Sequence, residues 1–170
     1  MKHLFFSIFF VFVTFPGLNA QSEIEYSRKG KFLFETNYSF ASTLFGGSTG
    51  LGLIFSEGEA LINMGIDCGK FARENFAVKG SFFVLTANGE SLVGLSAGFK
   101  YYAGGRFIIN PSLGILTAGG EREALASLHL GYAVKLANNI YLEPAIGYRA
   151  GVSSGSGGLL DLRLPFMLLF

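Results

Sequence analysis

Bulky apolar residues recur at every second position over most of the chain. From Leu160 to Phe170 every even position is Leu or Phe, whereas the odd positions include Asp161 and Arg163. Successive side chains of a β-strand point to opposite faces, so this stretch predicts a strand with one apolar face and one charged face. Seven other stretches alternate similarly and predict strands over residues 31–41, 60–71, 76–87, 92–103, 106–118, 124–137 and 140–151.

Short polar or glycine-rich segments separate these stretches. Asn88-Gly89 is typical of a two-residue β-hairpin, and Gly104-Gly105 and Asn138-Asn139 also interrupt the alternation. The series predicts an all-β fold, an eight-stranded antiparallel up-and-down transmembrane β-barrel over residues 31–170, with both termini at the short-turn end. The longest connection, 42–59, contains an apolar segment that is compatible with an extension of the neighbouring strands.

Alternation alone does not say which face points inward. A soluble lipocalin-like barrel turns its apolar face inward, whereas a membrane barrel turns it toward lipid. The eight apolar faces together hold more than thirty bulky residues, but a closed eight-stranded interior holds roughly a dozen side chains. The apolar faces are therefore expected to contact lipid. The opposite faces, rich in Gly, Ser, Asn and charge, would line a narrow lumen.

The N-terminal segment has a different composition. A basic start at Lys2 precedes an almost unbroken apolar run from Leu4 to Phe15, and Ala20 ends the segment. This layout predicts a cleaved secretory signal peptide over residues 1–20, with an N-terminal membrane anchor as the alternative. Residues 21–30 are polar and are interpreted as a periplasmic lead-in.

The charge balance limits the possible functions. The whole chain has 13 basic and 12 acidic residues, and Lys2 is the only charge in the predicted signal peptide, so the mature chain would be neutral. Nucleic-acid binding is disfavoured because it usually requires a basic surplus. The single cysteine, Cys68, excludes an internal disulfide.

Charged residues gather on the predicted lumen faces, where little water would surround them. They are therefore expected to pair. The predicted structural lumen charges are Lys31, Glu35, Asp67, Lys79, Lys100, Arg106, Lys135, Glu143, Arg149, Asp161 and Arg163. Two interpretations follow, a salt-bridge plug and an ion path. The plug is favoured because eight strands leave an interior just wide enough for side chains.

Three segments and the terminal Phe170 carry a family resemblance. The segments are Asn75-Phe76-Ala77-Val78-Lys79-Gly80, Phe99-Lys100-Tyr101-Tyr102 and Leu142-Glu143-Pro144-Ala145-Ile146-Gly147-Tyr148. The chain resembles small outer-membrane barrels of the OmpX/OmpA transmembrane type, most of all the outer membrane protein β-barrel domain families of Bacteroidota.

The resemblance implies a location in the bacterial outer membrane. It implies contact with outer-membrane lipid and lipopolysaccharide, and a monomeric state. It also implies that Phe166, Leu168 and Phe170 form a signal read by the outer-membrane assembly machinery.

Candidate catalytic chemistry is sparse. A lipid deacylase on this scaffold would need a His and a Ser together on the lipid face, but His129 and Ser127 fall on the lumen face. The mature chain would contain one histidine and one cysteine, on opposite faces of different strands, and these two residues do not make a metal site. We therefore expect no catalytic residue, cofactor or metal. The prediction is a structural or interaction protein with a plugged lumen. The alternatives are a narrow pore for small solutes or ions and a lipid-modifying enzyme.

Overall fold

The computed structural model describes residues 29–39, 51–56, 59–87, 90–152 and 158–170. The predicted signal peptide and most of the predicted lead-in lie outside these ranges. No helix in the described part of the chain is long and apolar enough to cross a membrane. The strands are β1 (Phe32–Ser39), β2 (Leu51–Ser56), β3 (Glu59–Arg73), β4 (Phe76–Ala87), β5 (Glu90–Ala103), β6 (Phe107–Ala118), β7 (Glu121–Tyr132), β8 (Val134–Ala137), β9 (Ile140–Leu142), β10 (Ala145–Gly151) and β11 (Gly158–Leu169).

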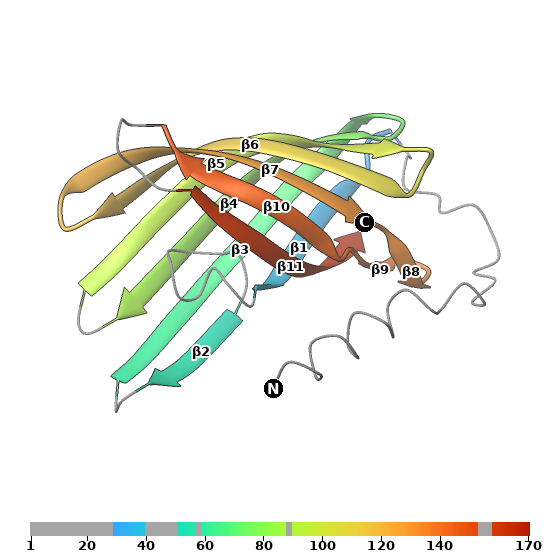
Figure 1. Cartoon of the computed structure of the whole chain (residues 1–170). Coiled ribbons are helices and arrows are strands. Elements are labelled where there is room, and N and C mark those ends of the chain that lie inside the picture. Colours follow the sequence, from blue (N-terminus) through green and yellow to red (C-terminus); the bar gives the residue numbers. More distant parts are fainter. Residues whose placement is uncertain (1–28, 40–50, 57–58, 88–89, 153–157) are drawn as a thin grey trace.

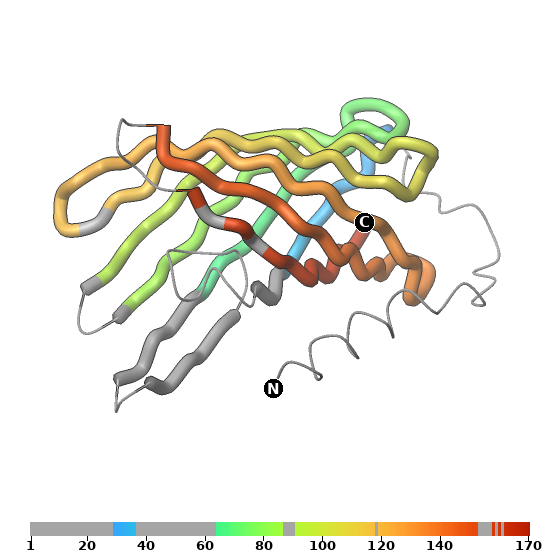
Figure 2. Tube along the Cα trace, in the orientation of Figure 1, coloured from blue at the N-terminus to red at the C-terminus, as the bar shows by residue number. Residues whose placement is uncertain are grey.

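The strands close into a ring of antiparallel pairs. Each neighbour pairs with the next in the order β1-β3-β4-β5-β6-β7-β10-β11, and β11 pairs with β1 from Leu33↔Leu169 to Ser39↔Arg163. The first and last strands therefore lie side by side, as the trace in Figure 2 shows. The predicted eight-stranded antiparallel up-and-down barrel is confirmed.

Two of the eight predicted strands are each divided in two. The predicted strand 124–137 forms β7 and β8, and the predicted strand 140–151 forms β9 and β10. The interruptions lie beside Pro144 and Pro165, which have no backbone N–H to donate to a ladder. The carbonyls of these prolines still accept bonds, from Tyr132 N at 3.0 Å and Glu143 N at 2.9 Å respectively. The sheet continues through the break by these single bonds.

The long connection contributes an extra strand. β2 pairs with the first half of β3, from Leu51↔Met64 to Ser56↔Glu59, and extends the barrel wall as a hairpin beyond the ring (Figure 1). Residues 40–50 and 57–58 of the predicted connection lie outside the described ranges.

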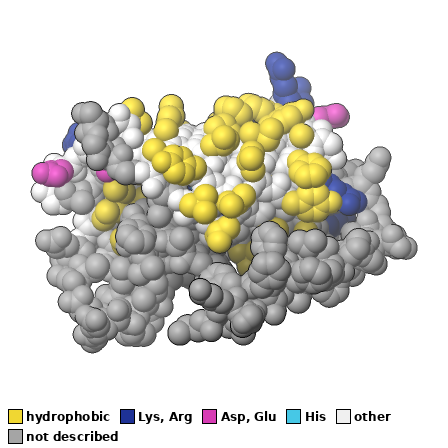
Figure 3. Space-filling view, viewed as in Figure 1, with side chains coloured by type: hydrophobic (Ala, Val, Ile, Leu, Met, Phe, Trp, Pro, Cys, Tyr) yellow, Lys and Arg dark blue, Asp and Glu magenta, His cyan; other side chains and the backbone are white. Residues whose placement is uncertain are grey.

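The outer surface of the barrel is apolar. Large hydrophobic side chains from every strand of the ring are exposed, among them Leu95 at 61%, Leu113 at 68% and Tyr148 at 55%. They form several groups over the described part of the face in Figure 3. A surface of this kind is suited to hydrocarbon and costly in water, so the structure is that of a membrane barrel.

The turns that join β3 to β4, β5 to β6 and β8 to β9 lie at the end where β1 begins and β11 ends, at the right in Figure 1. We refer to it as the terminal end. A buried apolar layer lies inside the barrel there, made of Leu33, Phe71, Ala77, Tyr102, Ile108, Ala133, Tyr141, Met167 and Leu169.

Candidate functional site

Five charged side chains from different parts of the ring meet inside the lumen. They are Glu35 on β1, Asp67 on β3, Lys79 on β4, Lys100 on β5 and Glu143 between β9 and β10, and each is at most 5% exposed. We call this set the lumen cluster. All five are among the charges that the sequence places on the inward faces.

Strand register brings the cluster together. Glu35 lies directly opposite Asp67 across the β1–β3 pair. Lys79 lies between Gly69 on β3 and Gly98 on β5. A Cβ at Gly69 would approach the Lys79 Cβ to 2.9 Å. The two glycines therefore leave room for a long lysine side chain inside a narrow barrel.

The cluster is a row of alternating charges. Lys79 Nζ donates to Asp67 Oδ2 at 2.6 Å and lies 3.5 Å from Glu35 Oε2. Lys100 Nζ donates to the other Glu35 oxygen and to Glu143 Oε2. Three carboxylates thus share two ammonium groups, and Arg163 adds electrostatic attraction on Asp67. Such a row keeps each charge near its opposite, as buried ions require.

An aromatic hydroxyl links this row to the apolar layer. Tyr102 Oη donates to Glu143 Oε1 at 3.0 Å and lies 3.4 Å from Met167 Sδ. The Tyr102 ring packs against Phe71 with centroids 5.7 Å apart. No role for these inward-facing apolar side chains was predicted from the sequence. Their positions in the alternating pattern could have indicated one, because bulky residues on a lumen face occupy the lumen.

Two small cavities lie in the lumen beside the cluster. A cavity of about 30 Å³ is lined by Lys79, Arg149, Arg163, Asn110, four serines and the apolar side chains of Phe83, Leu95, Ile115 and Leu125. Ser112 and Ser127, which are register partners on β6 and β7, hydrogen bond in its wall at 2.7 Å. A second cavity of about 10 Å³ lies against the cluster and touches Asp67, Asn110 and His129. The Oδ1 atoms of Asp67 and Asn110 are buried without a hydrogen-bond partner. These cavities hold about two water molecules and one, respectively.

The remaining predicted lumen charges lie outside the cluster. Lys135, on β8, is half-buried near the terminal end, as is Lys31 just before β1. The Asp161 side chain lies outside the described part of the structure. Arg106 differs from the expectation. It belongs to the turn between β5 and β6, where its guanidinium donates to Tyr132 Oη at 3.2 Å on the outer surface.

The candidate catalytic residues face the interior. His129 is 2% exposed and lies in the lumen wall, and Ser127 lines the larger cavity. Among the described residues no group of three His, Cys, Asp or Glu is arranged to hold a metal ion.

The predicted assembly residues lie on the outward face of the last strand. Phe166 and Phe170 are 37% and 70% exposed, and Leu168 between them is half-buried. The backbone of Phe170 exchanges bonds with Phe32, at 3.2 Å and 3.0 Å. The chain end is therefore held in the closing pair of strands.

The barrel has the same fold as several solved membrane barrels. It is similar to the N-terminal β-barrel domain of Pseudomonas aeruginosa OprF, with a TM-score of 0.57 and 13% identity over 84% of this chain and 98% of that one. It is also similar to the Yersinia pestis outer membrane protein Ail, with a TM-score of 0.50 and 10% identity over 84% of this chain and 100% of that one.

A third similar structure is Neisserial surface protein A, with a TM-score of 0.50 and 11% identity over 85% of this chain and 99% of that one. No family model matches the chain, and no curated protein sequence is significantly similar to it. What this chain has in common with the three solved proteins is the eight-stranded barrel fold.

Proposed function

We propose that this protein resides in the bacterial outer membrane as a closed barrel with a structural or interaction role. The observation that carries the proposal is the lumen cluster stacked on the buried apolar layer. Together they place buried side chains inside the barrel from Glu35 on β1 to Glu143 beside β10. The apolar outer wall and the fold shared with outer-membrane proteins support the location.

The geometry favours a plug over a pore. Passage of an ion would require breaking several buried ion pairs and displacing Tyr102 and Met167 from the apolar layer. The cavities beside the cluster hold only a few water molecules. The alternative of a narrow pore is supported by the polar lining of the larger cavity alone.

An enzymatic role has less support. Lipid substrates lie outside the wall, but His129 and Ser127 point into the lumen, where an acyl chain cannot reach them. We therefore propose a protein without catalytic function.

Finer assignments rest on the sequence. We propose membership of the OmpX/OmpA type and of the Bacteroidota β-barrel domain families, with a monomeric state. We also propose that Phe166, Leu168 and Phe170 are recognised by the assembly machinery, and that the outer wall contacts phospholipid and lipopolysaccharide. The exposure of Phe166 and Phe170 supports recognition of the last strand.

Single-channel conductance of the purified barrel in planar bilayers tests the plug. We expect the wild-type protein to be electrically silent. The double variant Lys100→Ala with Tyr102→Ala should conduct, because it removes two large side chains from the lumen. Stable channels of the wild-type protein would contradict the proposal. A boiling-dependent shift in gel mobility checks that both proteins are folded barrels.

A further inference from the structure

Three exposed basic side chains and one exposed aromatic ring lie at the terminal end. Lys29 precedes β1, Lys70 and Arg73 end β3, and Phe32 begins β1 with 56% of its surface exposed. We call this group the basic corner. It lies where the apolar outer wall gives way to polar surface.

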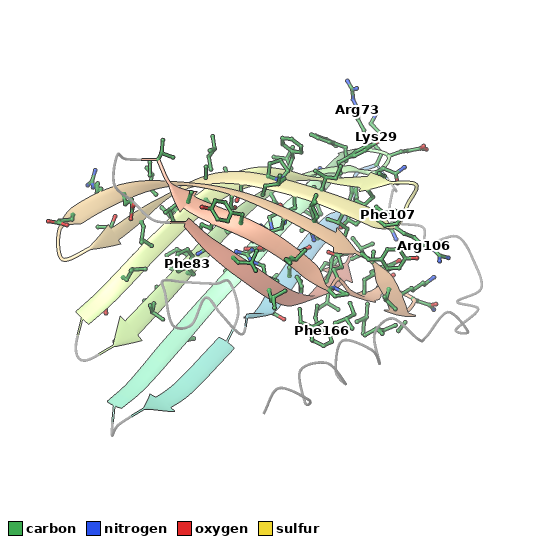
Figure 4. The ribbon with its side chains drawn as sticks, viewed as in Figure 1. Lys29, Arg73, Phe83, Arg106, Phe107 and Phe166 are labelled. Atoms are coloured by element: carbon green, nitrogen blue, oxygen red, sulfur yellow. The ribbon has the colours of Figure 1, made fainter. Side chains whose placement is uncertain are left out.

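The β1–β3 pairing assembles the corner. Phe32 is the register partner of Lys70, and the Lys70 ammonium lies 4.8 Å from the centre of the Phe32 ring. The pairing continues beyond β1, since Gly30 N donates to Phe71 O at 2.9 Å. Lys29 and Arg73 consequently extend from adjacent chain segments on the same side of the barrel, as Figure 4 shows.

Within the described part of the chain, the cations of the corner lie outside the buried ion pairs. Lys29, Lys70 and Arg73 take part in none of the ion pairs that hold the lumen cluster together. Three basic groups placed near one another repel, and an anion between them would relieve that repulsion.

The position of the corner identifies the kind of anion. The Lys70 ammonium lies over the exposed Phe32 ring at the end of the apolar wall. A lysine at the edge of a lipid-facing wall can extend its ammonium to the lipid headgroups. Basic groups at a membrane surface attract anionic lipids. A ligand that fits must have an apolar part against Phe32 and a negative part among the three cations.

We propose that the basic corner binds the headgroup of an anionic phospholipid in the leaflet that surrounds the terminal end. This inference rests on the proposed location, which makes that leaflet the periplasmic one. The acyl chains would lie along the Phe32 side of the wall, and the phosphate would lie between Lys29, Lys70 and Arg73.

The charge of the two barrel ends is consistent with this site. At the terminal end the other described basic residues are Lys31, Arg106 and Lys135, and Glu74 is the acidic one. At the opposite end the charges of the described β6–β7 hairpin are Glu121, Arg122 and Glu123. An anionic lipid is therefore attracted to the terminal end in preference to the other.

Electron spin resonance with spin-labelled lipids tests the proposal. The full mature barrel would be reconstituted in phosphatidylcholine with spin-labelled phosphatidylglycerol or phosphatidylcholine as probe. We expect the wild-type protein to retain the phosphatidylglycerol probe preferentially. The variant Lys70→Gln with Arg73→Gln should lose at least about fivefold in that preference, the effect of one basic side chain near an anionic surface.

A matched variant controls for diffuse charge. Arg106→Gln with Lys135→Gln removes two cations from the same end but away from Phe32, and should keep most of the preference. Equal loss in the two variants, or no preference in the wild-type protein, would overturn the site. Full displacement of the lipid probe by inorganic phosphate at constant ionic strength would overturn its assignment to a lipid.

The gel-mobility shift separates the two proposals. A protein that shifts on boiling and fractionates with the outer membrane, yet shows no lipid preference, refutes only the basic corner. A protein absent from the outer-membrane fraction refutes the proposed location.

Discussion

The Lys79 ammonium lies 2.6 Å from the Asp67 carboxylate, and their side chains are only 3% and 2% exposed. Removing one partner of such a pair leaves a buried charge, which costs about 3–5 kcal/mol. We expect Lys79→Met to lower the free energy of unfolding by that amount, measured by urea titration of the barrel in lipid vesicles.

The double variant Lys79→Met with Asp67→Leu tests the cause of that loss. It should be more stable than Lys79→Met alone, because the Asp67 carboxylate that lost its ammonium partner is removed as well. If the loss of stability in the double variant equalled the sum of the losses from Lys79→Met and Asp67→Leu, the ion pair would not be the origin of the effect.

Tyr102 and Tyr101 are adjacent in sequence but face opposite sides of the wall. Tyr102 is fully buried and donates to Glu143, whereas Tyr101 is 44% exposed on the lipid side. Tyr102→Phe should cost about 1.5–3 kcal/mol, because a charged acceptor loses its donor. Tyr101→Phe is the control, and it should change the free energy of unfolding by less than about 0.5 kcal/mol. Similar values for both would argue against the buried hydrogen bond.

The cost of placing a charged residue on the outer face should depend on its depth in the membrane. Leu130 is 52% exposed within β7, and Leu136 is 53% exposed on β8 near the terminal end. Leu130→Arg should cost about 2–4 kcal/mol, and Leu136→Arg about 0–1 kcal/mol because the guanidinium reaches the interface. Unfolding in vesicles measures both. Equal tolerance at the two positions would mean that this wall does not face lipid.

Gly98 allows two strands to approach closely. A Cβ there would lie 2.3 Å from the carbonyl oxygen of Pro111, a backbone atom that cannot move aside alone. Gly98→Ala should cost about 1–3 kcal/mol through overpacking. At Gly80 the nearest atom to an added Cβ is 3.8 Å away, so Gly80→Ala should leave the unfolding midpoint in urea almost unchanged.

Phe170 offers a test of the assembly signal that is separate from stability. The ring is 70% exposed, so Phe170→Ser removes little packing from the folded barrel. We expect slower appearance of the heat-modifiable form in cells, with unchanged urea stability of the refolded protein. Normal assembly kinetics in cells would show that this residue is not part of the signal.

The sequence alone determined the architecture and the two faces of each strand. Alternation has a period of two, so it assigns Leu130 and Lys79 to opposite faces without knowledge of their neighbours. The number of bulky residues on the apolar faces then excluded a barrel in which those faces point inward. The fold and its eight ring strands could be predicted because alternation is a local property of each strand, and the number of bulky residues is a simple sum over the strands.

Only the tertiary structure decided which charges meet. The alternating pattern predicted that Glu35, Lys100 and Arg106 all face the lumen. Strand register brings Glu35 and Lys100 into contact, whereas Arg106 lies in a turn and bonds to Tyr132 on the outer surface. Parity likewise could not show that Lys29, Lys70 and Arg73 gather at one corner, because this depends on the β1–β3 register. Contacts between distant residues follow from how strands slide past one another, and alternation along a single strand carries no information about that.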